Sequence, residues 1–300
     1  MQDDKTYELD KESFFARFPR KAEDAHKGSS GKILIVTGGW GMAGAACLNI
    51  LGAKALGAGY ILAAVPEDIY GIVAANNITP VYYPYPFGKG QNTVKELMKK
   101  TSPSEGSSGR IRAVSFGSGA VDLAGKYAVF EALADGCMSV LVLDAEALHI
   151  MAETGKTGFN RGSVRPVIIT PHYGEFSELS GIEIPAIKED PLRAALAFSE
   201  KHNVITVLKG PGTVVAAPDG RHYINRSGNQ GLAQAGSGDV LTGMITAMCS
   251  FKDDPFEAAC MAVFAHGMAA DELAKEHSLQ CLPIEDIPAA MDRLFKERGF

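Results

Sequence analysis

The chain has 300 residues, a length that predicts one large α/β domain or two modest ones with a sizeable core. Hydrophobic residues make up 46% and charged residues 21% of the sequence, values that exclude wholesale disorder. The net charge of −6 comes without any basic run, so we expect no nucleic-acid partner.

The cysteine pattern and the start of the sequence indicate the compartment. The five cysteines are scattered and form no CxxC pair, which favours reduced thiols over a zinc site or a disulfide framework. The first thirty residues hold no apolar region typical of a signal peptide, and no stretch reaches the roughly 18 apolar residues of a spanning helix. We therefore expect a soluble, cytoplasmic protein without a membrane partner.

The first half of the chain alternates short apolar runs with helical patterns. Such alternation is typical of βα units that form a parallel sheet covered by helices on both faces. Prolines within the run at 81–85 favour an edge position for that strand. The expected strands lie at 32–39, 59–65, 81–85, 111–116 and 139–143, and a small-residue helix is expected over 43–56.

The second half continues this alternation and then becomes mostly helical. Strands are expected at 167–170 and 204–208, a hairpin at 213–217 and 222–225 around the Pro-Asp-Gly turn, and helices at 240–248, 255–275 and 285–296. Two Ser/Gly/Pro-rich stretches, 101–109 and 153–162, predict surface loops rather than domain linkers, because the alternation continues across them. We expect one domain over residues 25–300, preceded by an extension at 1–24.

A glycine-rich stretch at 228–243 precedes one of the expected helices. Glycines at 228, 231, 236 and 238 leave backbone N–H groups free to bind an anion at the helix N-terminus. Asp239, in the first helical turn, could take a proton from an attacking hydroxyl. The alternative is that Asp239 only caps the helix and the glycines only form the turn.

Three further segments lie where expected strands end, the edge at which α/β proteins bind ligands. Lys209–Thr213 (KGPGT) could hold a phosphate, although a lysine at a strand end is usually only solvated. His172 in TPHYGEF faces the same edge, or is an ordinary surface residue. The small residues of 38–46 (GGWGMAGAA) would let a flat ligand lie against the backbone, or would serve close helix–sheet packing.

The order of these motifs resembles one family. VLDAEAL (142–148), TPHYGEF (170–176), VLKGPGTVV (207–215) and NRSGNQGLAQAGSGDVLTG (225–243), with the opening HKGSSGKILIVTGGWGMAGAA (26–46), resemble the NAD(P)H-hydrate dehydratases, the YjeF C-terminal domain family. The resemblance covers nearly the whole chain. It implies a ribokinase-like fold, a three-layer α/β/α sandwich around a mainly parallel sheet.

The resemblance also implies a reaction. Members of this family dehydrate the S epimer of NADHX or NADPHX back to NAD(P)H, through a phosphorylated intermediate and with Mg²⁺. The branch that resembles this chain generally uses ADP and releases AMP and phosphate, although ATP is the alternative donor. The family often forms homotetramers. Because only about 25 polar residues precede the match, the R epimer would need a separate NAD(P)HX epimerase.

The resemblance assigns roles to residues that match the motifs. Asp239 would be the catalytic base, and Gly236, Ser237 and Gly238 would form the anion hole. The adenine nucleotide would contact Lys209, Gly210, Pro211, Gly212, Thr213 and Gly238. Ala45, Gly117, Gly119, His172 and Asp239 would contact NAD(P)HX, while Glu175 and Asn225 would help to place the metal ion.

The sequence departs from the family pattern at a few places, and other functions stay open. Ser237 stands where the family usually has Thr, Glu146 where it has Asp, and Tyr173 where it has Pro, and the glycine motif at 117–119 is shorter than usual. One alternative is a ribokinase-like kinase for a small alcohol such as a vitamin precursor, which would accumulate a phosphorylated product. Another is a nucleotide sensor without activity, which the intact Asp239 loop disfavours.

Overall fold

A single mixed sheet forms the centre of the protein. The computed structural model describes residues 5–24, 31–86, 88–105, 109–121, 123–156 and 166–300. Within these ranges nine strands are arranged in the order β3-β2-β1-β4-β5-β6-β7-β8-β9, with β1 to β7 parallel and β8 and β9 antiparallel to their neighbours. The strands are β1 (Lys32–Val36), β2 (Tyr60–Pro66), β3 (Val81–Tyr85), β4 (Ala113–Phe116), β5 (Val140–Leu143), β6 (Val167–Ile169), β7 (Ile205–Leu208), β8 (Val214–Ala216) and β9 (His222–Ile224).

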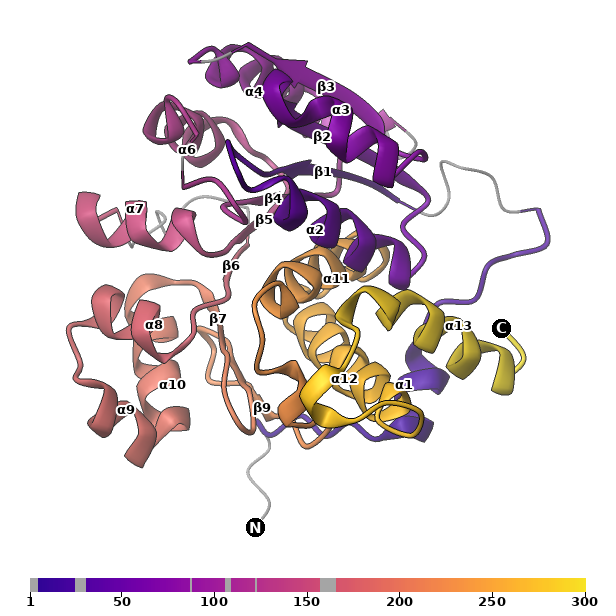
Figure 1. The fold of residues 1–300 in the computed structure, drawn as a ribbon. Helices are drawn as coiled ribbons and strands as arrows, with labels where there is room; N and C mark the ends of the chain where they lie inside the picture. Colours follow the sequence, from indigo (N-terminus) through magenta and orange to yellow (C-terminus); the bar gives the residue numbers. More distant parts are fainter. Residues whose placement is uncertain (1–4, 25–30, 87, 106–108, 122, 157–165) are drawn as a thin grey trace.

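Helices cover both faces of this sheet, so the molecule has three layers (Figure 1). One face carries α1 (Lys11–Arg17), α2 (Ala43–Ala55), α3 (Glu67–Asn76), α11 (Ser237–Phe251), α12 (Pro255–Leu273) and α13 (Ile287–Glu297). The opposite face carries α4 (Gly90–Lys99), α6 (Lys126–Gly136), α7 (Glu146–Thr154), α8 (Tyr173–Ser180), α9 (Ile184–Glu189) and α10 (Pro191–His202). Short 3₁₀ turns lie at Pro103–Glu105, Gln230–Leu232, Leu279–Cys281 and Ile284–Asp286.

The strand sequences explain the two cores. In β1 the side chains of Ile33 and Ile35 belong to one buried cluster, and those of Leu34 and Val36 belong to the other. Successive side chains of a strand point to opposite faces, so a strand that is apolar throughout requires cover on both sides. The predicted parallel sheet with helices on both faces is therefore confirmed.

Two glycines allow α2 and α11 to approach each other closely. A Cβ on Gly52 would lie 2.0 Å from the Val240 carbonyl oxygen, and a Cβ on Gly243 would lie 1.9 Å from the Asn49 carbonyl oxygen. No side chain larger than hydrogen fits at such distances. This contact sets the start of α11, which carries Asp239, beside α2.

The N-terminal residues pack on the domain. Thr6 pairs with His222 of β9, and α1 begins at an Asp10 cap whose carboxylate accepts a hydrogen bond from the Ser13 N–H. Phe14 of α1 is fully buried and its ring contacts that of Phe264 on α12. Apolar burial of this kind anchors residues 5–18 to the helices of one face.

The individual elements agree with most of the sequence predictions. The strand at 81–85 is at an edge of the sheet, and the predicted hairpin is β8 and β9. The strand expected from residue 111 starts at Ala113, and the helix expected from residue 285 starts at Ile287 after a 3₁₀ turn. The stretch at 101–109 contains a 3₁₀ turn, whereas residues 157–162 lie outside the described residues. No helix in the described part of the chain is long and apolar enough to span a membrane.

Candidate active site

The carboxyl ends of the parallel strands bring the predicted motifs to one edge of the sheet. Gly117–Gly119 follow β4, Asp144 follows β5, Thr170–His172 follow β6, and Lys209 follows β7. The loops after β6 and β7 are themselves joined, because the Lys209 N–H donates to the Pro171 carbonyl oxygen at 2.8 Å. Parallel strands end on the same side, so motifs that are far apart in the chain meet there.

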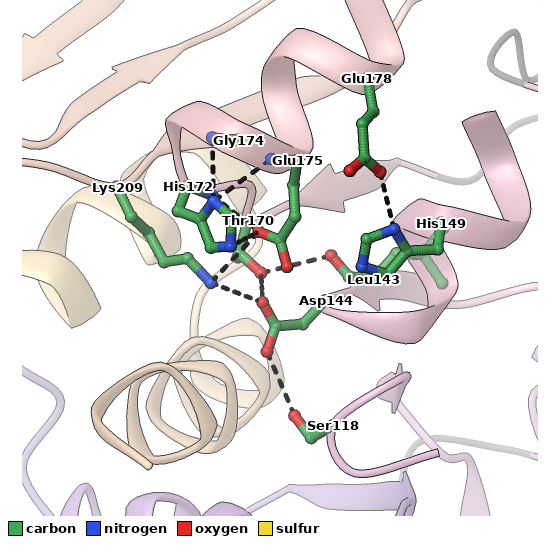
Figure 2. Close-up of polar contacts among 10 residues, drawn as sticks. All are labelled: Ser118, Leu143, Asp144, His149, Thr170, His172, Gly174, Glu175, Glu178 and Lys209. Atoms are coloured by element: carbon green, nitrogen blue, oxygen red, sulfur yellow. Dashed lines mark hydrogen bonds and ion pairs between the residues drawn. The ribbon is translucent and has the colours of Figure 1, made fainter. Parts of the chain in front are cut away.

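The Asp144 carboxylate lies at the centre of this edge (Figure 2). It accepts hydrogen bonds from the Thr170 hydroxyl at 2.6 Å, the Lys209 ammonium at 2.8 Å and the Ser118 hydroxyl at 3.3 Å. Burial of Asp144 opposes its ionisation, but the Lys209 charge and the hydrogen bonds from Lys209 and Thr170 hold the pKa of Asp144 below its ordinary value. Asp144 is therefore a buried carboxylate anion with one cationic partner and two hydroxyl donors.

Lys209 is the cation of the site. Its ammonium lies 2.8 Å from Asp144 and 3.9 Å from the Glu175 carboxylate. Burial opposes its charge, but Asp144 and Glu175 raise the pKa of Lys209 above its ordinary value. A Cβ on Gly238 would lie 3.3 Å from the Lys209 Nζ, so the ammonium reaches the first turn of α11. Lys209 thus combines with the glycine loop to favour an anion.

His172 begins helix α8. Its Nδ1 accepts hydrogen bonds from the Gly174 and Glu175 N–H groups, and the Glu175 carboxylate accepts one from the His172 N–H at 2.7 Å. The reciprocal pair is a capping box, which satisfies donors that the helix leaves free. Because Nδ1 accepts, the proton of a neutral imidazole is on Nε2, which lies 3.7 Å from the Glu175 carboxylate, beyond hydrogen-bond distance, and can donate to a ligand.

The start of α11 carries the predicted anion hole and base. Gly236 caps the helix with φ +92°, and a Cβ there would lie 2.5 Å from Leu48. The Ser237 N–H donates to the Gln234 carbonyl oxygen over 3.4 Å, a long contact for an amide. Helix α11 has 15 residues, so its N-terminus provides both unpaired N–H groups and a positive dipole end.

The pKa of Asp239 is raised well above that of an ordinary aspartate. Burial and the nearby Asp144 charge raise its pKa from 3.8 to about 7, while the Ser118 hydroxyl and the Lys209 ammonium oppose this increase. A carboxyl group with a pKa close to neutrality both accepts and returns a proton at the pH of the cell. This is the property that a general base requires.

A cavity of about 810 Å³ opens beside these residues. Asp144, Lys209, Gly238 and Asp239 line one part of it, and all of the predicted nucleotide-binding residues from Lys209 to Thr213 are among its walls. Residues 225–230 and 232–234 also line the cavity, and α12 contributes Val263, His266 and Gly267. The volume is that of a site for a nucleotide-sized ligand.

The residues predicted to contact NAD(P)HX lie in two places. His172 lines the cavity. Ala45 and Gly119 instead lie against each other, because a Cβ on Gly119 would be 2.7 Å from the Ala45 Cβ. Gly117 has φ +124°, and a Cβ there would lie 1.8 Å from the Asp144 carbonyl oxygen, which is a packing reason for this glycine. Ser118, between the two glycines, connects this side to Asp144.

The two residues expected to place a metal ion have internal partners. Glu175 accepts from the His172 N–H, and Asn225 accepts from the Tyr223 and Ser227 hydroxyls. Within the described ranges, no group of three His, Cys, Asp or Glu side chains could hold a metal ion. Magnesium is commonly bound through substrate phosphates, water and one or two carboxylates, so the residues present fit an ion that arrives with a nucleotide.

Several residues of this site have no role predicted from the sequence. Asp144 stands in the VLDAEAL motif directly after a strand, a position that could have indicated it. Its neighbour Ala145 has φ +47°, a strained conformation for alanine that often marks functional sites. His266 is buried mid-helix in α12, where burial lowers its pKa to about 4, and no local sequence signal distinguishes it from a core residue.

Comparisons with known proteins agree with this geometry. Residues 33–291 match the profile of the Carb_kinase family, described as NAD(P)H-hydrate dehydratase. The chain is 30% identical over 282 residues to an ADP-dependent (S)-NAD(P)H-hydrate dehydratase from Bacillus subtilis, covering 94% of this chain and 95% of that protein. It is 32% identical over 276 residues to a bifunctional NAD(P)H-hydrate repair enzyme from Moorella thermoacetica, covering 91% of this chain but only half of that protein.

A solved structure is also similar. The crystal structure of an ADP/ATP-dependent NAD(P)H-hydrate dehydratase from Bacillus subtilis, co-crystallized with ATP and Mg²⁺, superposes with a TM-score of 0.82 at 28% identity. The superposition covers 96% of this chain and 97% of that one. A hydroxyethylthiazole kinase from Pyrococcus horikoshii is similar at a TM-score of 0.60 and 15% identity, a likeness of fold alone.

Proposed function

This chain belongs to the NAD(P)H-hydrate dehydratase family, and we propose that it is an ADP-dependent enzyme that dehydrates the S epimer of NADHX or NADPHX to NAD(P)H. The reaction repairs nicotinamide nucleotides. One observation supports it above the others: Asp239, whose pKa is raised to about 7, lies between a nucleotide-sized cavity and the loop that carries Gly117–Gly119.

The first step is transfer of a phosphoryl group. Asp239 accepts the proton of the C6 hydroxyl of the hydrate, and the hydroxyl oxygen forms a bond to the β-phosphorus of ADP as AMP leaves. The N–H groups at the start of α11, including that of Gly238, and the Lys209 ammonium face the negative charge that develops on the phosphoryl oxygens. Positioning of this kind is the main contribution of a protein to phosphoryl transfer.

The second step is elimination. Hydroxide is a poor leaving group, whereas phosphate, which leaves from the ester formed in the first step, is a good one. The electron pair of the ring nitrogen expels phosphate, and the released phosphate takes a proton from the neighbouring ring carbon, which restores the dihydropyridine. His172 would orient the substrate, since its Nδ1 is held by the α8 cap and its Nε2, 3.7 Å from the Glu175 carboxylate, is the ring nitrogen that can donate to a ligand.

Mg²⁺ is proposed to accompany the nucleotide. The ion would lower the charge of the phosphates and be held mainly by phosphate oxygens and water, with Glu175 and Asn225 as the residues proposed to help place it. Lys209–Thr213 and Gly238 are proposed to hold ADP. The similar Bacillus subtilis enzyme, which was co-crystallized with ATP and Mg²⁺, supports a nucleotide and magnesium in this cavity.

The experiment that tests this function is an absorbance assay with hydrated NADH and Mg²⁺, with ADP or ATP added in parallel. We expect the reduced-nicotinamide band to return with ADP and one AMP to form for each NADH. Return of the band with ATP alone would support the dehydratase function but show that ATP, and not ADP, is the phosphoryl donor. If neither nucleotide restores the band while both bind, the dehydratase proposal fails and a small-alcohol kinase becomes the alternative.

We also propose the setting in which the enzyme works. It is expected to act in the cytoplasm, as the scattered cysteines indicate, and to assemble as a homotetramer. The R epimer would be converted by an epimerase activity outside this chain, which spans half the length of the bifunctional relatives it matches. Light scattering of the purified protein tests the tetramer, and the yield from an epimer mixture, with and without added epimerase, tests the partner.

A further inference from the structure

Asp144 is the one described carboxylate that touches groups from three other strand ends of the site. Thr170 follows β6, Lys209 follows β7, and Ser118 lies in the loop after β4. Ser118 in turn accepts a hydrogen bond from Asn49 of α2 at 3.1 Å. Only 2% of Asp144 is exposed, so water cannot replace these partners. The carboxylate therefore joins the nucleotide side of the site to the substrate side.

Lys209 depends on this carboxylate for its position. Its contact with Asp144 is 2.8 Å and that with Glu175 is 3.9 Å, so the first is the hydrogen-bonded partner. Glu175 is also occupied by the His172 N–H. Without Asp144, a buried ammonium would keep only the longer contact, and the negative charge of Asp239 would be its next partner at the start of α11.

We propose that Asp144 is a positioning residue for the dehydratase reaction: its buried carboxylate holds the Lys209 ammonium beside Gly238 and presents a second negative charge to Asp239. The inference rests on the proposed function of Asp239 as the base. Asp144 acts through these two side chains, and in this proposal it takes no proton from the substrate. The strained backbone at Ala145, with φ +47°, is consistent with a fold that holds Asp144 at this point.

Ionisable groups on four elements lie around Asp239 and its partners. Asp144 after β5 disfavours its ionised form, and Lys209 after β7 favours it. Glu175 on α8 acts one step further away, through Lys209, whereas His266 on α12, with its pKa lowered to about 4, is neutral where Asp239 titrates. Asp144 and Lys209 are thus the two charges that set when Asp239 gives up its proton.

The test is the pH dependence of kcat/KM for Asp144→Asn, measured from the return of the reduced-nicotinamide band. In the wild type the acid limb is expected near pH 7, where Asp239 ionises. The variant removes a like charge and leaves the Lys209 charge uncompensated, so the limb is expected to move roughly one pH unit lower. A limb within 0.2 unit of the wild type, roughly the precision of such profiles, would overturn the proposal.

Glu146→Gln is the matched control. Glu146 lies two residues further along the chain, is also buried, and pairs with Lys126 at 2.5 Å rather than with Lys209. The variant makes the same change from carboxylate to amide in a buried ion pair. It is expected to lower stability and leave the acid limb in place. An equal shift in both variants would mean that the shift reports general loosening, and would overturn the role of Asp144.

A second variant covers the case in which Asp144→Asn does not fold. Lys209→Met removes the cation but leaves Asp144 with its Thr170 and Ser118 hydroxyl donors, so Asp144 ionises first and Asp239 must ionise against its charge. The ionisation of Asp239 is then expected to move above pH 7, opposite in direction to Asp144→Asn. No upward shift would contradict the proposal.

A readout without turnover separates this inference from the proposed function. The carboxyl carbon of Asp239 is followed by NMR in protein labelled with ¹³C-aspartate, and its signal is identified by its loss in Asp239→Asn. If the wild type does not convert hydrated NADH but the two variants shift the Asp239 titration in opposite directions, the proposed function fails and the coupling stands. If the wild type is active but the titration does not move, only the coupling fails.

Discussion

Replacement of the proposed base by an amide, Asp239→Asn, is expected to remove activity and to stabilise the protein at the same time. The asparagine keeps the shape of the side chain but cannot accept the proton of the C6 hydroxyl. General-base catalysis contributes about 10²- to 10⁴-fold in rate, so kcat should fall by that factor. The KM for ADP should change little, because Lys209 and the glycine loop are untouched.

The stability gain follows from the raised pKa of Asp239. Folding raises this pKa from 3.8 to about 7, so the folded state binds the proton more tightly than the unfolded state does. Its stabilising contribution is complete below pH 3.8 and is lost as the pH rises through 7. At pH 8 this loss amounts to at most about 4 kcal/mol. We expect Asp239→Asn to recover about 1–3 kcal/mol of it, because the amide must also leave water.

Two assays measure these effects. Initial rates with hydrated NADH, ADP and Mg²⁺ give kcat, and urea unfolding at pH 8 and at pH 4.5 gives the free energy of unfolding. The gain from the variant should be largest at pH 8 and should shrink at pH 4.5. In the wild type, kcat/KM should rise about tenfold between pH 6 and pH 8, the change in the ionised fraction of a group with a pKa of about 7.

Three results would contradict the proposed role of Asp239. A wild-type profile that is flat from pH 6 to pH 8 would mean that Asp239 is ionised throughout and is not desolvated as described. Full turnover in Asp239→Asn would remove it as the base. If Asp239→Asn is less stable than the wild type at pH 8, the ionised Asp239 carboxylate does not lower the free energy of unfolding as described.

Three further predictions concern packing and capping. Gly243→Ala should destabilise the protein by about 2–4 kcal/mol in urea unfolding, because its Cβ would lie 1.9 Å from the Asn49 carbonyl oxygen. Its control is Gly71→Ala in α3, which has open space around it and should stabilise the protein by about 0.5–1 kcal/mol. Equal effects of the two variants would contradict the close packing of α2 and α11. Phe14→Ala should cost about 3–5 kcal/mol in the same assay because the ring is fully buried, and a loss below 1 kcal/mol would show that α1 does not anchor residues 5–18. His172→Ala and His172→Asn should both raise the KM for hydrated NADH. Only the alanine variant should lose about 1 kcal/mol of stability, because asparagine can still cap α8. Equal stability of the two variants would refute the capping role of His172.

Much of the fold could be predicted because its signals are local. Each parallel strand is a short apolar run, and the predicted runs match the strands in order, with boundary errors of at most three residues. The prolines of 81–85 correctly indicated an edge, since proline cannot donate to a neighbouring strand. Helix α1 was not predicted, because its burial depends on α12, more than two hundred residues away.

The site was predictable in part, for the same reason. The Gly-rich loop and Asp239 are adjacent in the chain, so one local pattern contains both the anion-binding turn and the proposed base. Asp144 and Lys209 are 65 positions apart, and only the parallel order of β5, β6 and β7 brings them within 2.8 Å. No window of sequence contains that pair.

By itself, the sequence determined the strand and helix pattern, the family to which the chain belongs and the residues that could do chemistry, because backbone preference and side-chain type are local properties. Only the tertiary structure decided which of these residues act on one another. The pKa of Asp239 is the clearest case: the same carboxyl group would ionise near 3.8 in the unfolded chain and does so at about 7 in the folded one. The desolvation of Asp239 and its repulsion by the Asp144 carboxylate, which is distant in sequence, arise only when the fold has brought the strand ends together.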